Sequence, residues 1–345
     1  MLISEFDFEL PDELIAQQPL RERDASRMLV LDRAANSWTD SAFLDLPKYL
    51  RAGDLLVVNN TRVFPARLVG KRDPSGGQVE LFLIREEALG LWVALARPAR
   101  KLSVGSRVEF GDRRLMGEIV GELDEGKRLV QFSPAETFRE LLEEIGQTPL
   151  PPYIRRDEPA RNSDRERYQT VYARESGAIA APTAGLHFTP KVFDAVKAAA
   201  AEIAGITLHV GYGTFEPVRA TDTGSHRVSP ESFEISEAAA EQINRAKREE
   251  RRVIAVGTTT VRALEAASQA SGTITGGAGQ AEITIVPGYE FRIVDGLVTN
   301  FHLPKSSLLL LVSAFAGTEF VLGAYRHAVA GGYRFYSYGD CMLII

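Results

Sequence analysis

Residues 66–148 contain a series of short runs rich in Val, Leu and Phe, and turn residues separate each run from the next. The runs lie at 67–70, 79–84, 91–96, 107–110, 116–120 and 129–132. Gly, Pro and Asp mark the turns between them. Strands this short and this evenly spaced are typical of a small antiparallel barrel or sandwich. A helical pattern over about 135–145 closes the segment.

The chain on both sides of this segment alternates between strand-like and helical patterns. Strand-like runs lie at 28–31, 55–58, 178–181, 206–210 and 253–256. Helical patterns lie at 12–17, 191–203, 237–252, 260–270, 306–315 and 319–330. We also expect a hairpin over 283–286 and 291–294 and a last strand over 333–336. Such alternation predicts an α/β domain with a largely parallel or mixed sheet.

We therefore predict a discontinuous α/β domain with a mixed sheet and an inserted small antiparallel β-barrel domain. The α/β domain comprises residues 1–65 and 149–345, and the inserted domain comprises residues 66–148. The first two strand-like runs have few helical partners of their own, so we assign them to the α/β sheet. A proline-rich stretch at 149–152 marks the second boundary, and the Gly-rich residues 272–279 predict a loop.

The composition of the 345 residues, 45% hydrophobic and 25% charged, excludes intrinsic disorder for most of the chain. The single cysteine, Cys341, excludes a disulfide framework and a cysteine-based zinc site. The N-terminus has no secretory pattern, and the longest strongly apolar stretch, 308–315, is far too short to span a bilayer. We expect a cytoplasmic protein that contacts no membrane. The net charge of −6 still allows a local basic patch.

A strand, a tight turn and a helix follow one another in residues 253–265, with three threonines at the turn. Thr258, Thr259 and Thr260 would present hydroxyls and backbone N–H groups at a helix N-terminus, which suits a carboxylate or another anion. The alternative is that they only cap the helix. Arg262 on the first helical turn favours the anion site.

Another strand-end loop, residues 181–189, holds Thr183, Gly185 and His187. Loops at the carboxyl ends of strands are where α/β enzymes keep their chemistry. A histidine there can transfer a proton near neutral pH, or it can simply hydrogen-bond the loop together.

A third loop contains Gly213 and Thr214 in a Gly-Tyr-Gly-Thr sequence, and Glu216 follows. The glycines allow a ligand to approach the backbone closely, and Glu216 is a candidate base or ribose ligand. The missing third glycine makes this a weak dinucleotide signal. His209 lies within an apolar strand and is expected to be a core histidine.

Polar residues also gather near the C-terminus. Asn300, His302, Lys305 and Ser306 precede an apolar helix, where the last two either bind a carboxylate or cap the helix. Asp340 follows an aromatic cluster whose rings can stack on a base or attract a sulfonium. The five histidines are scattered, so we expect no metal site.

Taken together, these motifs closely resemble the S-adenosylmethionine:tRNA ribosyltransferase-isomerase family of queuosine biosynthesis. The matching segments are 59–63, 181–189, 211–215, 257–265, 300–308 and 338–342. The resemblance implies that the ribosyl group of S-adenosylmethionine is transferred to 7-aminomethyl-7-deazaguanine at the tRNA wobble position and isomerised. The products would be epoxyqueuosine, adenine and methionine. The resemblance further implies S-adenosylmethionine as co-substrate, with no metal or prosthetic group.

This reaction gives the loops plausible roles. The sulfonium acidifies the ribose C5′ proton, so a base is needed, and His187 and then Glu216 are the candidates. His302 or Asp340 would protonate the departing adenine. Thr258 to Thr260, with Arg262, would bind the methionine carboxylate. The remaining predicted substrate-binding residues are Thr183, Gly185, Gly213, Thr214, Asn300, Lys305 and Ser306.

The tRNA partner requires cationic groups despite the negative net charge. We predict tRNA contacts by Arg155, Arg156, Arg165, Arg167 and Arg174, for which the alternative is a solvated surface. We expect a monomer. Two other functions remain open from the residues alone. One is an S-adenosylmethionine-dependent RNA methyltransferase, although the glycine loop expected after its first strand is not evident in this sequence. The other is a non-catalytic RNA-binding module, which would leave the polar loops without a function.

Overall fold

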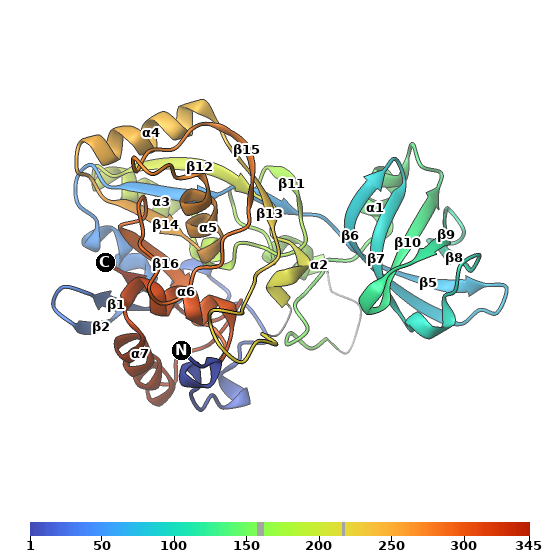
Figure 1. Ribbon diagram of the computed structural model, residues 1–345, viewed down its shortest axis with the longest axis horizontal. Coiled ribbons are helices and arrows are strands. Elements are labelled where there is room, and N and C mark those ends of the chain that lie inside the picture. Colours follow the sequence, from blue (N-terminus) through green and yellow to red (C-terminus); the bar gives the residue numbers. More distant parts are fainter. Residues whose placement is uncertain (157–161, 216–217) are drawn as a thin grey trace. The chain divides into compact units, whose positions relative to one another are not determined.

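The computed structural model describes residues 1–156, 162–215 and 218–345. The chain forms two compact units (Figure 1), and each is described by itself. The α/β unit contains Met1–Arg62, Pro152–Arg155 and Gln169–Ile345. The barrel unit contains Val63–Pro151 and Arg156–Tyr168. Among the described residues, Arg156 and residues 162–168, predicted for the α/β domain, belong to the barrel unit.

The α/β unit is built on a nine-stranded mixed sheet in the order β15-β13-β12-β3-β14-β16-β17-β1-β2. The strands are β1 (Arg27–Asp32), β2 (Ser37–Ala42), β3 (Leu55–Asn59), β12 (Glu202–Leu208), β13 (Glu231–Ile235), β14 (Val253–Val256), β15 (Gly277–Ala281), β16 (Gly296–Asn300) and β17 (Cys341–Ile344). The neighbours β12, β3, β14 and β16 are parallel, so their carboxyl ends meet at one edge. β17 joins them antiparallel and pairs with β1 in parallel.

Helices cover the sheet on its two faces (Figure 1). They are α3 (Pro190–Ala198), α4 (Glu237–Arg248), α5 (Thr258–Ala267), α6 (Ser307–Ala316) and α7 (Thr318–Ala330). Val192 and Val196 of α3 pack in one buried cluster with strand residues such as Val58 and Val256. α5 contacts β14, β12, β3 and β16. Within the described residues, no single helix is long and apolar enough to cross a membrane. α6 and α7 together have the length and composition of a membrane span, but the chain bends by 116° between them.

The barrel unit contains a closed six-stranded antiparallel barrel in the order β10-β7-β6-β5-β8-β9. The strands are β5 (Arg67–Asp73), β6 (Gln78–Ala88), β7 (Leu91–Arg97), β8 (Arg107–Phe110), β9 (Leu115–Glu122) and β10 (Lys127–Ser133), with helices α1 (Phe138–Ile145) and α2 (Asn162–Arg167). Every second residue of β10 is buried, which is the alternation expected of a filled barrel. The predicted α/β fold with an inserted antiparallel barrel is confirmed.

Several sequence-based elements were wrong. The strand expected at 178–181 ends at Ala178, and β11 (Glu175–Ala178) pairs with β4 (Thr61–Val63) in a separate two-stranded sheet. Residues 283–294 form no hairpin; the Glu265 carboxylate instead accepts backbone N–H groups of Arg292, Ile293 and Val294 and organises this apolar stretch as a loop. Residues 333–336 form no strand, and the last strand is β17. The Gly-rich segment predicted as a loop contributes β15 in its second half.

Candidate active site

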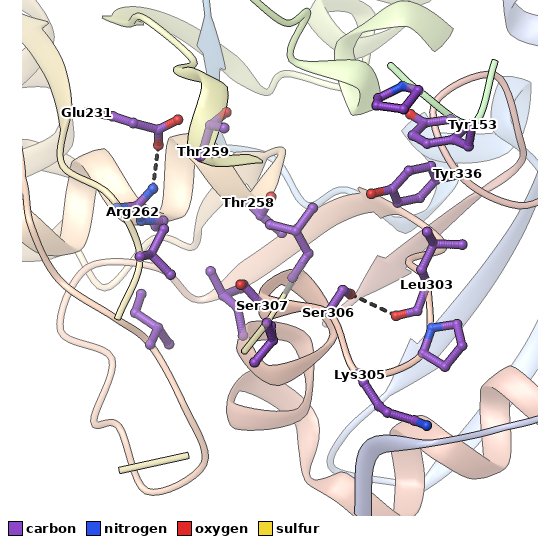
Figure 2. Close-up of a pocket in the computed structure, with 18 residues that line it drawn as sticks. Tyr153, Glu231, Thr258, Thr259, Arg262, Leu303, Lys305, Ser306, Ser307 and Tyr336 are labelled. Atoms are coloured by element: carbon purple, nitrogen blue, oxygen red, sulfur yellow. Dashed lines mark hydrogen bonds and ion pairs between the residues drawn. The ribbon is translucent and has the colours of Figure 1, made fainter. Parts of the chain in front are cut away.

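A cavity of about 350 Å³ lies in the α/β unit at the carboxyl ends of β12, β14 and β16 (Figure 2). This volume is within the range of small-molecule sites, and strand ends of this kind are where α/β proteins bind ligands. The lining residues are Pro152, Tyr153, Gly213, Val218, Val228, Glu231, Thr258, Thr259, Arg262, Ile285, Leu303, Pro304, Lys305, Ser306, Ser307, Leu308, Leu311 and Tyr336. Gly213, Thr258, Thr259, Arg262, Lys305 and Ser306 were predicted as binding residues.

The beginning of α5 supplies the polar part of the cavity. Gly257 precedes the helix with a φ of +94°, a conformation that favours glycine. Thr258 and Thr259 follow on the first turn and line the cavity. The first N–H groups of a helix have no partner within it, so this turn can receive a carboxylate. The Thr260 hydroxyl is already engaged, because it donates to the Val256 carbonyl at 2.7 Å.

A buried ion pair forms one side of the cavity. The Arg262 guanidinium contacts the Glu231 carboxylate and also donates to the carbonyls of Ala281 (2.7 Å) and Ser229 (3.2 Å). The other Glu231 oxygen accepts the Gly211 N–H at 2.9 Å. Burial raises the pKa of Glu231, and Arg262 opposes that shift. Arg262 therefore already has an anionic partner, which corrects the expectation of a cation available to the substrate carboxylate.

Two tyrosine rings lie across the cavity from this ion pair in Figure 2. The rings of Tyr153 and Tyr336 meet at a centroid distance of 4.0 Å and an angle of 65°. Tyr153 also hydrogen-bonds through its hydroxyl to Ser337. Tyr336 has a φ of +74°, which is unfavourable for a bulky residue. Its conformation is held by the Asn300 amide, which donates to the carbonyls of Tyr336 (2.8 Å) and Ser337 (3.3 Å).

His187, the first candidate base, lies behind this wall and does not line the cavity. It ends the 3-10 turn Thr183–His187, and only 4% of its surface is exposed. Because the Asn300 amide nitrogen faces two carbonyls, its Oδ1 accepts from His187 Nε2 at 3.2 Å. His187 Nδ1 then accepts from the Ser26 hydroxyl at 2.8 Å. Burial lowers the pKa of His187 to about 4, so the ring is neutral at pH 7.

His302 and Asp340, the candidate proton donors, also lie outside the lining. His302 Nε2 is 2.9 Å from the Thr299 hydroxyl, and burial lowers its pKa to about 3. Asp340 accepts the backbone N–H groups of Arg27 (2.9 Å) and Arg334 (2.8 Å). Burial raises the pKa of the Asp340 carboxyl. His302 and Asp340 therefore hydrogen-bond within the fold and do not face the cavity.

The two neutral histidines make stability depend on pH. Between pH 6.5 and about 4 the unfolded chain binds more protons than the folded one, so the free energy of unfolding falls as the pH falls. Each histidine contributes a slope of at most about 1.4 kcal/mol per pH unit. We expect His302→Gln to reduce the difference in unfolding free energy between pH 7 and pH 5, measured by urea denaturation. Equal pH dependence in wild type and variant would contradict this.

The rim of the cavity is formed by the segment before α6. Lys305 pairs with Asp7 at 2.7 Å. Ser306 caps α6, accepting the Leu309 N–H at 3.2 Å and donating to the Leu303 carbonyl at 2.7 Å. Ser307 contacts His226 Nε2 at 2.8 Å.

The other predicted binding residues are placed differently. Thr183, Gly185 and Asn300 lie near His187 rather than at the cavity. Gly213 lines it, at the 3-10 turn Tyr212–Phe215 that also contains Thr214. Glu216, the second candidate base, lies outside the described residues.

The predicted tRNA-binding arginines are divided between the two units. Arg155 and Arg174 belong to the α/β unit, whereas the other three belong to the barrel unit. Arg156 forms a two-pronged pair with Asp164, at 2.9 Å for each bond, and Arg165 pairs with Glu143. Arg167, too, has contacts within the structure.

Sequence reasoning missed Glu231, Tyr153 and Ser307. Glu231 had a usable signal, since residues 231–235 alternate and place the carboxylate on the same buried face as Phe233 and Ile235. A charged residue at a buried position of a strand indicates a partner or a site. No comparable sequence pattern marks Tyr153 or Ser307 as a cavity residue.

The fold and cavity define an α/β protein with a pocket of small-molecule size, lined by hydroxyls, aromatic rings and one ion pair. The described residues contain no group of three or more His, Cys, Asp or Glu side chains arranged to hold a metal. The family described as "Queuosine biosynthesis protein" matches residues 3–344, and the chain belongs to this family. The family resemblance drawn from the motifs is confirmed.

Similar proteins cover the whole chain. A protein of Desulforamulus reducens named S-adenosylmethionine:tRNA ribosyltransferase-isomerase is 48% identical over 345 residues, with 100% of both chains covered. One of the same name from Symbiobacterium thermophilum is 50% identical over 347 residues, also with 100% coverage of both. A crystal structure of S-adenosylmethionine tRNA ribosyltransferase from Thermotoga maritima is 35% identical, with a TM-score of 0.57 over 99% of this chain and 100% of the other.

Proposed function

We propose that this protein is an S-adenosylmethionine:tRNA ribosyltransferase-isomerase. It transfers the ribosyl group to 7-aminomethyl-7-deazaguanine at the wobble position of tRNA, isomerises it to give epoxyqueuosine and releases adenine and methionine. The observation that carries the proposal is full-length similarity of about 50% to proteins of that name. We propose that the protein acts in the cytoplasm, on tRNA, and as a monomer.

The cavity supports this assignment through its three kinds of surface. The N-terminus of α5, with Thr258 and Thr259, suits the methionine carboxylate. The rings of Tyr153 and Tyr336 suit a purine or a sulfonium. Glu231 is the single carboxylate among the described lining residues, and its pair with Arg262 adds little net charge next to the sulfonium.

The reaction needs a base for the C5′ proton and a donor for adenine. Glu216 is our candidate base, because it follows the cavity-lining Gly213 by three residues. We assign His187 a positioning role, since both ring nitrogens are engaged and Asn300 links it to Tyr336. The nucleophile is the amine of the substrate base, so we propose that no prosthetic group is required.

The test is chromatography of a reaction containing the protein, S-adenosylmethionine and tRNA that carries the aminomethyl-deazaguanine base. We expect adenine and methionine in equal amounts, and neither with tRNA that lacks the modified base. S-adenosylhomocysteine would instead indicate a methyltransferase. Retained tRNA binding without any product would indicate a non-catalytic RNA-binding module.

A further inference from the structure

A second cavity, of about 480 Å³, lies in the α/β unit over β3 and β12. The mechanism proposed above uses none of the residues that line it. They are Val58, Asn60, Val171, Tyr172, Arg174, Pro190, Phe193, Asp194, Lys197, Ile203 and Gly205. We refer to this set as the Gly205 groove.

The groove exists because a glycine occupies an inner strand of the sheet. β12 lies between β13 and β3, where a side chain would normally cover the sheet. A Cβ atom at Gly205 would meet only Asn60 Nδ2, at 3.9 Å, so the space above the strand is open. Glycine weakens a strand, and it often marks a place where a ligand approaches the backbone.

One polar donor points into that open space. Asn60 follows β3, and its Oδ1 accepts the Thr207 hydroxyl at 2.7 Å, which leaves its Nδ2 facing Gly205. No hydrogen bond joins this amide nitrogen to another residue in the described ranges. Asn60 adjoins Asn59, whose amide reaches the hydroxyl of Thr259, a lining residue of the first cavity, at 3.5 Å.

Aromatic and cationic side chains form the walls. The rings of Tyr172 and Phe193 meet edge to face at 5.5 Å. Arg174 and Lys197 are exposed, and neither is within 4.0 Å of a carboxylate of any described residue. Asp194 is the one acidic residue of the lining, so the groove carries an excess of positive charge. An aromatic wall beside free cations is the combination that binds single-stranded nucleic acid.

We propose that the Gly205 groove binds one nucleotide of a single-stranded segment of the tRNA substrate, in addition to the base that reacts. The base lies over Gly205 and accepts a hydrogen bond from Asn60, and the phosphate lies between Arg174 and Lys197. This inference rests on the proposed function, because that function supplies the RNA.

The groove can be filled by a single substitution. We expect Gly205→Phe to raise the Kd for tRNA about tenfold, measured by fluorescence anisotropy, and to leave the Kd for S-adenosylmethionine unchanged. Gly205→Ala is the matched control, since its methyl group meets no closer atom than 3.9 Å, and it should stay within about twofold of wild type. The double variant Arg174→Ala/Lys197→Ala changes only exposed side chains, and we expect it to reduce the slope of log Kd against log salt by about 1.

The outcomes separate this proposal from the proposed function. Unchanged tRNA affinity in folded Gly205→Phe, or an unchanged salt slope in the double variant, overturns the groove proposal even if adenine is released normally. Should Gly205→Phe not fold, the double variant decides. Binding of free AMP that Gly205→Phe abolishes, with tRNA affinity unchanged, would assign the groove to a free nucleotide and also overturn the proposal. If the wild-type protein releases no adenine but Gly205→Phe still weakens tRNA binding, the groove proposal is supported and the proposed enzymatic function is refuted.

Discussion

Replacing Arg262 with methionine is expected to lower the free energy of unfolding of the α/β unit by about 3–5 kcal/mol, the usual cost of removing one partner of a buried ion pair. Arg262 is 5% and Glu231 4% exposed, so bulk solvent screens a lone Glu231 charge only weakly. Without Arg262, the Glu231 carboxylate keeps one bond, from the Gly211 N–H, and the Ala281 carbonyl loses its donor.

Tryptophan fluorescence can isolate this effect. The chain has two tryptophans, Trp38 in the α/β unit and Trp92 in the barrel unit. In a Trp92→Phe background, urea unfolding followed at Trp38 reports on the α/β unit alone. The matched control is Arg262→Met/Glu231→Gln, which removes the buried charge but keeps an acceptor for Gly211. We expect it to recover most of the loss, and a double variant as unstable as Arg262→Met would refute the ion-pair explanation.

The pH dependence of Arg262→Met provides a second check. Burial raises the pKa of Glu231, and the variant lacks the guanidinium that opposed this shift. A carboxyl group with a raised pKa binds more protons in the folded than in the unfolded state, so it stabilises the fold as the pH falls. The difference in unfolding free energy between variant and wild type should therefore be smaller at pH 5 than at pH 8.

Asn300→Ala is expected to lower kcat/KM for S-adenosylmethionine about 5- to 150-fold, which corresponds to about 1–3 kcal/mol for a lost buried hydrogen-bond partner. The variant loses the donor that holds the Tyr336 and Ser337 carbonyls, and His187 loses its acceptor. Tyr336 has an unfavourable backbone conformation, so its ring should no longer be held at the cavity wall. Steady-state kinetics with saturating modified tRNA would measure the loss.

Two controls distinguish positioning from proton transfer. Asn300→Asp keeps an acceptor for His187 but lacks the donor to Tyr336, so we expect it to be nearly as impaired as Asn300→Ala. Since burial lowers the pKa of His187 to about 4, a positioning role predicts that kcat does not depend on the ionisation of His187 between pH 6 and 8. His187→Gln should therefore keep the wild-type pH profile at a lower rate. Loss of an acidic limb in that variant would restore His187 as the base. An Asn300→Ala enzyme with wild-type kinetics would rule out the positioning role.

Local pattern was sufficient for most of the fold. Apolar runs such as 28–31 and 253–256 became β1 and β14, and the evenly spaced runs of 66–148 became the barrel strands. These features follow from the side-chain period of each element and from turn residues within a few positions, both of which can be read along the chain. The Gly257 turn with Thr258 and Thr259 was predicted for the same reason, because strand, turn and helix start are adjacent in sequence.

The tertiary structure alone decided which polar residues meet. Arg262 joins Glu231, 31 residues away, and Tyr153 reaches Ser337, 184 residues away. His187 and Asn300, 113 residues apart, bond to each other behind the cavity, although both looked like site residues. Local periodicity determines which face of an element is buried, but it contains no information on which buried polar groups face one another. That depends on strand order and on how loops close over the sheet, and these set the burial and charge environment of each side chain.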